Sequence, residues 1–152
     1  MSETETQAFS LSIEQVDAYE FRVRFDDTPI PELLTDEPPP LGGDAGPNPS
    51  RLLVTAVVNC LASSLLFALR KFSNEPAGLR AQARATLGRN AERRWRVERV
   101  TVDLHLSEDA GTIQKLDRIL EQFEQFCVVT QSVREGIAVD VHVHDGSGRT
   151  LQ

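Results

Sequence analysis

The chain has 152 residues, of which 40% are hydrophobic and 26% are charged, and its formal net charge is -7. This length fits one domain with a sizeable core, which we expect to span residues 1–152. The net negative charge argues against nonspecific binding to nucleic acid. The first residues, MSETETQAF, lack the basic and apolar segments of a signal peptide, so we expect a cytoplasmic protein.

Two short runs near the N-terminus alternate apolar and polar residues, as half-buried strands do. The first run places Phe9, Leu11 and Ile13 on one face, and the second spans residues 19–25. This pattern predicts a β-hairpin with its turn near Asp17. The segment that follows, TPIPELLTDEPPPLGGDAGPNP, contains too many prolines for a central strand and is expected to form a long loop.

An uncharged run of eighteen residues, LLVTAVVNCLASSLLFAL, occupies residues 52–69. A helix of this length reaches about 27 Å, barely the thickness of a bilayer core, so a membrane span and a buried helix both fit. Its hydroxyl and amide side chains are poor choices for contact with lipid, and the predicted strands need an apolar cover. We therefore expect a buried central helix and no membrane, with Asn48 as N-cap and Pro49 as first helical residue.

Alternation returns in two longer runs after the apolar segment. Residues 79–87 place leucine and alanine on one face, and residues 95–106 form a second expected strand. In this second run the apolar face changes from odd-numbered to even-numbered positions, which predicts a β-bulge near Glu98 and Arg99. A last strand is expected over residues 137–143.

The segment between these later strands carries apolar residues at helical spacing, and Ser107 is its expected N-cap. A further short helix, VVTQSVRE, is expected to end at Gly136. The resulting order of elements predicts an α+β fold with a mostly antiparallel sheet and a long central helix. The spaced apolar residues, which place the second cysteine on the buried face, are Ile113, Leu116, Ile119, Leu120, Phe123 and Cys127.

Charge is distributed unevenly along the chain. Residues 1–50 hold eleven acidic side chains against two arginines, whereas residues 70–99 hold nine basic side chains against three acidic ones. Such opposite charges fit either a nucleic-acid face or two segments that pack together, within a subunit or across a dimer. Since only Trp95 is interleaved among the basic residues, we expect packing and no nucleic-acid partner.

The two cysteines, Cys60 and Cys127, are too few for a disulfide-stapled scaffold. Spacing alone leaves three interpretations open, namely inert core residues, a redox pair and metal ligands, with inert residues favoured. A reactive thiol must ionise near neutral pH. Cys60 lies about 16 Å beyond the start of its helix, too far for that end to stabilise a thiolate. We therefore expect a nearby cation, with Arg22 and Arg24 as candidates.

Histidines offer a weaker signal for a metal. His142 and His144 share an expected strand face with Asp140, and His105 shares one with Asp103. Imidazoles at positions i and i+2 can bind one ion. These faces are the polar ones, opposite the cysteines, so solvated histidines are the better interpretation. We expect no metal and no other cofactor.

Two segments resemble one known family. LGGDAGPNPSRLLVTAVVNCLASSLL is similar to the signature of the osmotically inducible protein C and organic hydroperoxide resistance (OsmC/Ohr) family, and QFCVVTQSVREGIAVDVHV is similar to its C-terminal block. The resemblance implies an intertwined homodimer in which long central helices pack against sheets. It also implies a peroxiredoxin-like, cysteine-dependent reductase of organic hydroperoxides that an external dithiol reduces. Cys60 would be the peroxidatic thiol and Cys127 the resolving thiol.

The sequence departs from the family pattern at two positions. Ser50 stands where characterised members have a glutamate that positions an arginine beside the thiol, and Val128 stands where a proline often follows the second cysteine. One expectation is that another acid, Glu37 or Asp44, supports the arginine. The alternative is a redox-inactive module of the same fold that binds an apolar small molecule around Cys60.

Overall fold

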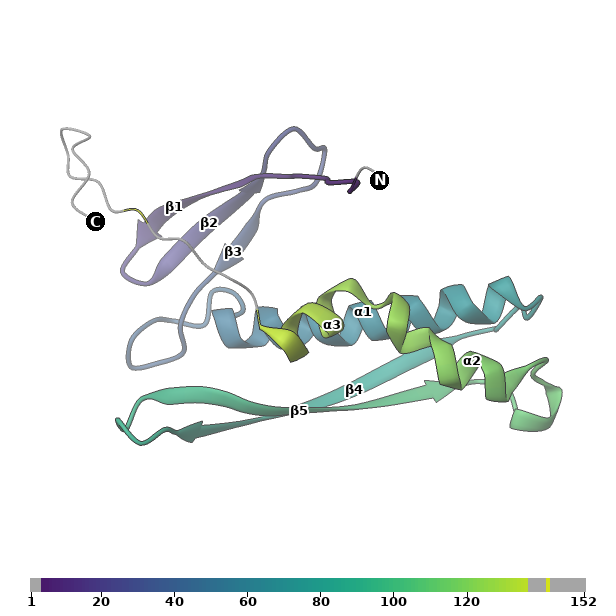
Figure 1. The fold of residues 1–152 in the computed structure, drawn as a ribbon. Helices are drawn as coiled ribbons and strands as arrows, with labels where there is room; N and C mark the ends of the chain where they lie inside the picture. Colours follow the sequence, from purple (N-terminus) through teal and green to yellow (C-terminus); the bar gives the residue numbers. More distant parts are fainter. Residues whose placement is uncertain (1–3, 137–141, 143–152) are drawn as a thin grey trace. The chain divides into compact units, whose positions relative to one another are not determined.

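A computed structural model describes residues 4–136 and 142 (Figure 1). Contacts along the chain divide it into two compact units, the first made of residues up to Thr55 together with Ala85–Arg99. The second is made of Ala56–Arg84 and the described residues from Val100 onward. In chain order the elements are β1 (Leu11–Asp17), β2 (Glu20–Phe25), β3 (Leu33–Thr35), α1 (Pro49–Lys71), β4 (Leu79–Arg89), β5 (Trp95–Leu106), η1 (Ala110–Thr112), α2 (Leu116–Gln122), η2 (Phe123–Phe126) and α3 (Val128–Glu135).

The first unit contains a three-stranded antiparallel sheet with the order β1-β2-β3. The hairpin predicted near Asp17 is confirmed, since β1 and β2 pair from Leu11 opposite Phe25 to Asp17 opposite Glu20. Ala18 adopts a positive φ of 38° in the turn. Strand β3 was not predicted. It is short and lies at the edge of the sheet, where flanking prolines interrupt no ladder of hydrogen bonds.

The loop after β3 folds back on the buried carboxylate of Asp36. This carboxylate accepts hydrogen bonds from the backbone N–H groups of Ala45 at 3.1 Å, Gly43 at 2.9 Å and Glu37 at 2.8 Å. The N–H groups favour the charged form, led by that of Ala45, and hold the pKa of Asp36 below its usual value. Gly46 is required here, because a Cβ at this position would collide with the backbone carbonyl of Leu34.

Helix α1 begins where the sequence predicted. The Asn48 side-chain oxygen accepts a hydrogen bond from the Arg51 N–H at 3.0 Å, which is the N-cap geometry. The Asn48 amide group also donates to the Glu37 carboxylate at 3.4 Å. The cap is therefore fixed by the preceding loop as well as by the helix, and Pro49 takes the first helical position.

By length and composition alone α1 could cross a membrane, a test that the core helix of a soluble protein also passes. In the second unit, residues of α1 form an apolar core with the helical segments that run back along it (Figure 1). Half-buried residues of the two long strands, among them Val102 and Leu104, pack against this core. The buried side chains of this core are Val57, Leu61, Leu65, Ala68, Leu69, Ile119, Phe123 and Cys127.

Strands β4 and β5 form a separate two-stranded sheet. Their connection is held by Asn90, whose side-chain oxygen accepts hydrogen bonds from the N–H groups of Glu92 and Arg94. Burial in β5 alternates from Val100 onward but changes phase at Glu98 and Arg99, which are both exposed. This is the position at which the sequence predicted a β-bulge; the change of burial phase is observed, and the bulge itself stays a prediction. The described strands thus form two sheets rather than the one that the sequence suggested.

The prediction that a helix begins at Ser107 is wrong. The Ser107 hydroxyl instead bonds the backbone of Gly78, donating to its carbonyl and accepting from its N–H, both at 2.9 Å. This pairing holds the end of β5 against the start of β4. Helix α2 begins only after Lys115, whose φ of 58° breaks any continuous helix from Ser107.

The apolar spacing predicted the buried face correctly for Ile119, Phe123 and Cys127 but was wrong for Leu120, which is 51% exposed. Ile119 and Cys127 are both 0% exposed, because η1, α2 and η2 follow one another with nearly helical periodicity. Helix α3 and its end at Gly136, with a φ of 83°, are confirmed. The strand predicted over residues 137–143 lies outside the described residues.

Candidate active site

The structure brings the two cysteines together. Cys60, from the middle of α1, is partly buried, and Cys127, at the N-cap of α3, is completely buried in the same core. Each thiol perturbs the pKa of the other, and both are reduced. Side chains 67 positions apart in sequence therefore lie in one cluster of the structure.

Helix α3 begins at Cys127, whose backbone serves as the N-cap. This backbone is extended, with φ -81° and ψ 93°, and its carbonyl accepts the helical hydrogen bond from the Gln131 N–H at 3.0 Å. The Cys127 thiol makes no capping bond to the backbone and instead donates to the Thr130 hydroxyl oxygen, with 2.9 Å between sulfur and oxygen. Thr130, the third residue of the helix, therefore holds the thiol through its side chain.

Ser64 completes the surroundings of Cys127. It follows Cys60 by four residues on α1, so both side chains lie on the same face of that helix. The Ser64 side chain is buried, and its hydroxyl helps to lower the pKa of Cys127. Cys127 is thus in contact with three polar side chains, those of Cys60, Ser64 and Thr130, in otherwise apolar surroundings.

Backbone N–H groups of the first turn of α3 are directed at the sulfur pair. Those of Val129 and Thr130 act to lower the pKa of Cys60, and that of Thr130 also acts to lower the pKa of Cys127. N–H groups at a helix start have no partner within the helix and carry partial positive charge. A negative charge shared between the two sulfurs is therefore stabilised by the start of α3.

The two thiols differ in acidity. Burial raises the pKa of Cys60, and its hydrogen bond to the neighbouring Cys127 sulfur raises it further. Burial also raises the pKa of Cys127, but hydrogen bonds from Cys60, Thr130 and Ser64 outweigh burial and bring the pKa of Cys127 below its usual value. Because each thiol perturbs the pKa of the other, the pair loses its first proton as a unit, and the negative charge is shared between the two sulfurs.

This arrangement differs from the cation that the sequence suggested. The groups that perturb the pKa of either thiol are burial, hydroxyl groups, backbone N–H groups and the other thiol. Sequence reasoning missed Ser64 and Thr130. The available signals were the Cys-x-x-Thr spacing of an N-cap with its partner, and a hydroxyl four residues after Cys60 on the same helix.

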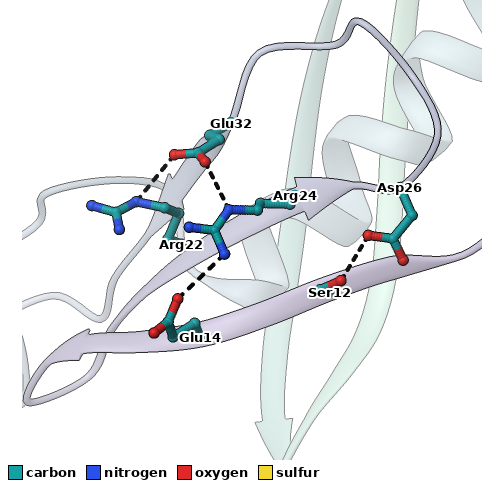
Figure 2. A network of polar contacts seen from close by, with 6 residues as sticks. All are labelled: Ser12, Glu14, Arg22, Arg24, Asp26 and Glu32. Atoms are coloured by element: carbon teal, nitrogen blue, oxygen red, sulfur yellow. Dashed lines mark hydrogen bonds and ion pairs between the residues drawn. The ribbon is translucent and has the colours of Figure 1, made fainter.

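The candidate arginines form a network in the first unit (Figure 2). The Arg22 Nε atom lies 3.1 Å from one carboxylate oxygen of Glu32, and the Arg24 Nε atom lies 2.8 Å from the other. Arg24 also pairs with Glu14 at 3.3 Å. The expectation that Glu37 or Asp44 supports these arginines is wrong, because Glu32 and Glu14 do so. An action of either arginine on Cys60 stays a prediction.

The metal interpretation finds little to support it. His105 and Asp103 are exposed on β5, whereas Asp140 and His144 lie outside the described residues. Among residues 4–136 and 142, no three histidine, cysteine, aspartate or glutamate side chains are grouped so that they could hold an ion.

Comparisons with known proteins identify the fold. A family model described as OsmC-like protein matches residues 42–142, which include both cysteines. No curated protein matches the chain. Among solved structures, an OsmC-like protein of unknown function from Vibrio cholerae is similar with a TM-score of 0.68 at 17% identity, over 84% of this chain and 94% of that one.

Two further similar structures are of proteins described as organic hydroperoxide resistance proteins. An organic hydroperoxide resistance protein from Elizabethkingia anophelis is similar with a TM-score of 0.66 at 18% identity, over 90% of this chain and 95% of that one. An organic hydroperoxide resistance protein from Legionella pneumophila, also described as a predicted redox protein, has a TM-score of 0.66 at 13% identity, over 86% of this chain and 92% of that one. At these identities the likeness concerns the fold.

Proposed function

Because the chain belongs to the OsmC-like protein family, we propose that it is a thiol-dependent peroxidase that reduces organic hydroperoxides. The observation that carries the proposal is the placement of Cys60 against the apolar core that contains Cys127, where each thiol perturbs the pKa of the other. Structural relatives described as organic hydroperoxide resistance proteins add support. Cys60 is the peroxidatic thiol in this proposal because it is the more exposed sulfur, and Cys127 is the resolving thiol.

The reaction starts from the pair with one proton removed. With the remaining proton on Cys127, the Cys60 thiolate attacks the terminal oxygen of the hydroperoxide. The O–O bond breaks, Cys60 becomes a sulfenic acid, and the alkoxide leaves with the proton held by Cys127 as an alcohol. The Cys127 thiolate then attacks the Cys60 sulfur and releases hydroxide, so that a disulfide, an alcohol and hydroxide have formed from one thiol, one thiolate and one hydroperoxide.

The surroundings favour an organic substrate. The sulfurs are surrounded by apolar side chains of α1 and of the helical segments that follow β5, which suit an alkyl or aryl group better than the water-like hydrogen peroxide. The disulfide stores the two electrons lost to the hydroperoxide, and an external dithiol returns them.

The partner in this proposal is a second copy of the chain, in an intertwined homodimer. Several apolar side chains of β1 and α1 are exposed in the single chain, more than an isolated subunit would be expected to leave in water. They are Leu11, Ile13, Val16, Leu53 and Phe67. A mass in solution equal to one chain, measured by light scattering at micromolar concentration, would contradict the dimer.

The alternative is a redox-inactive module that binds an apolar small molecule beside Cys60. Ser50, in place of the family's glutamate, favours it, as does the absence of a cation from the groups that perturb the two described thiols. A Cys60→Ser variant that binds such a ligand normally and supports full activity in cells would establish this alternative.

The deciding experiment counts thiols. Reduced protein is treated with excess cumene hydroperoxide, and free thiols are measured with time. The wild-type protein should lose both thiols and form one intramolecular disulfide, whereas Cys127→Ser should stop at a sulfenic acid that dimedone traps. Cys60→Ser should keep its remaining thiol. An unchanged thiol count in the wild-type protein would rule out the peroxidase cycle.

A further inference from the structure

The two sulfurs differ in ways that bear on how their disulfide would be reopened. Cys60 is partly exposed, whereas Cys127 is 0% exposed beneath it. A thiolate must approach a disulfide along the line of the S–S bond, and the rate depends on access to the attacked sulfur and on the stability of the leaving thiolate. Access therefore favours attack on Cys60.

Stabilisation of the leaving group favours the same direction. Attack at Cys60 expels the sulfur of Cys127, which lies at the N-cap of α3 and 2.9 Å from the Thr130 hydroxyl oxygen. The buried Ser64 hydroxyl also helps to lower the pKa of this thiol. In the reduced protein Cys127 donates to Thr130, and the hydroxyl can rotate to donate once the sulfur is an anion. Ser64 and Thr130 are neutral, so they stabilise a thiolate while adding no charge to the core.

We propose that the external dithiol attacks only the Cys60 sulfur and that Cys127 leaves as a thiolate, with Thr130 and Ser64 as positioning residues for that departure. The inference rests on the proposed function for the origin of the disulfide. It assigns roles to two hydroxyl groups and a direction to the reductive half of the cycle.

The reduction proceeds through two displacements at sulfur. One thiolate of the dithiol forms a bond to the Cys60 sulfur, the S–S bond breaks, and its electron pair goes to Cys127. The second thiol of the reductant then attacks its own sulfur in the mixed disulfide, closes a cyclic disulfide and releases Cys60. The dithiol gives two electrons and two protons, and both cysteines end as they are in the reduced structure.

The test uses a disulfide made without hydroperoxide. The protein is oxidised with diamide, which withdraws two electrons from the thiol pair, and is then treated with the monothiol β-mercaptoethanol. The reaction is stopped with N-ethylmaleimide, and the labelled peptides are mapped by mass spectrometry. The mixed disulfide is expected on Cys60 and the maleimide on Cys127. The reverse labelling, or failure of diamide to form the disulfide, would overturn the inference.

Variants test the hydroxyl groups. Thr130→Val keeps the shape of the side chain but removes the donor and should slow reduction by about tenfold, the usual order for a hydrogen bond to an anion that is present in part at the transition state. Thr130→Ser should restore the rate. Ser132→Ala is the matched control, since that hydroxyl lies on the same helix but donates to the Val128 carbonyl. A wild-type reduction rate in both Thr130→Val and Ser64→Ala would overturn the role of the hydroxyls.

The two proposals fail separately. A protein that forms the disulfide with diamide but not with cumene hydroperoxide would lose the proposed function and still test the direction of reduction. A mixed disulfide on Cys127 in a protein that consumes hydroperoxide would remove this inference alone.

Discussion

Ile119 offers a quantitative test of the core that holds the thiol pair. Its side chain is 0% exposed in α2 and packs in the same cluster as Cys127. Ile119→Ala removes three carbon groups, each with a transfer free energy of about 0.8 kcal/mol, and leaves a cavity that relaxes only in part. Together these effects should lower the free energy of unfolding by about 3 to 4 kcal/mol. Ile119→Val, which removes one carbon group, should lower it by about 1 kcal/mol.

The next residue is the matched control. Leu120 is 51% exposed on the same helix, so Leu120→Ala should change the free energy of unfolding by no more than about 0.5 kcal/mol. Urea denaturation followed by circular dichroism measures all three variants, with the slope against urea expected to stay constant. Equal losses in Ile119→Ala and Leu120→Ala would refute this description of the core, and with it the enclosure of Cys127.

Three further predictions concern the thiols and the start of α1. Although burial raises the pKa of Cys127, the hydrogen bonds from Cys60, Thr130 and Ser64 hold it below its usual value, so Thr130→Val should move the ultraviolet absorbance of the thiolate to higher pH; an unmoved titration would contradict this. Asn48→Ala should lower the free energy of unfolding by about 1 kcal/mol, whereas Asn48→Ser, which keeps a capping oxygen and adds no charge beside Glu37, should lower it less. Cys127→Ser should keep the first turnover with hydroperoxide and lose the later ones, measured as alcohol formed per protein with a dithiol present.

Features that depend on neighbouring residues were predictable from the sequence. The hairpin near Asp17, the start of α1 at Pro49 and the end of α3 at Gly136 follow from alternation, capping and glycine conformation within a few residues. The buried side of Cys127 followed in the same way, because apolar spacing reports the buried face even where the helix is broken.

Features that depend on distant residues were not predictable from the sequence. Ser107 has the local signature of an N-cap, but Gly78, far earlier in the sequence, satisfies its hydroxyl instead and the helix begins later. The position of Ser64 near Cys127 requires α1 to pack against the start of α3, which no local pattern specifies. The contact of Thr130 with Cys127 spans only three residues, and its Cys-x-x-Thr spacing was overlooked. Glu32 was overlooked as the arginine partner because it lies in a segment without periodicity.

The network on β2 responds unequally to the loss of its members. Loss of either arginine leaves the other bonded to Glu32, and Arg24 also has a second ion pair with Glu14 (Figure 2). Loss of Glu32 leaves Arg22 without an ion pair among the described residues and leaves Arg24 with Glu14 alone. Glu32 is therefore the residue that joins the two arginines into one network, and without it only a single cross-strand pair holds β1 to β2 on this face.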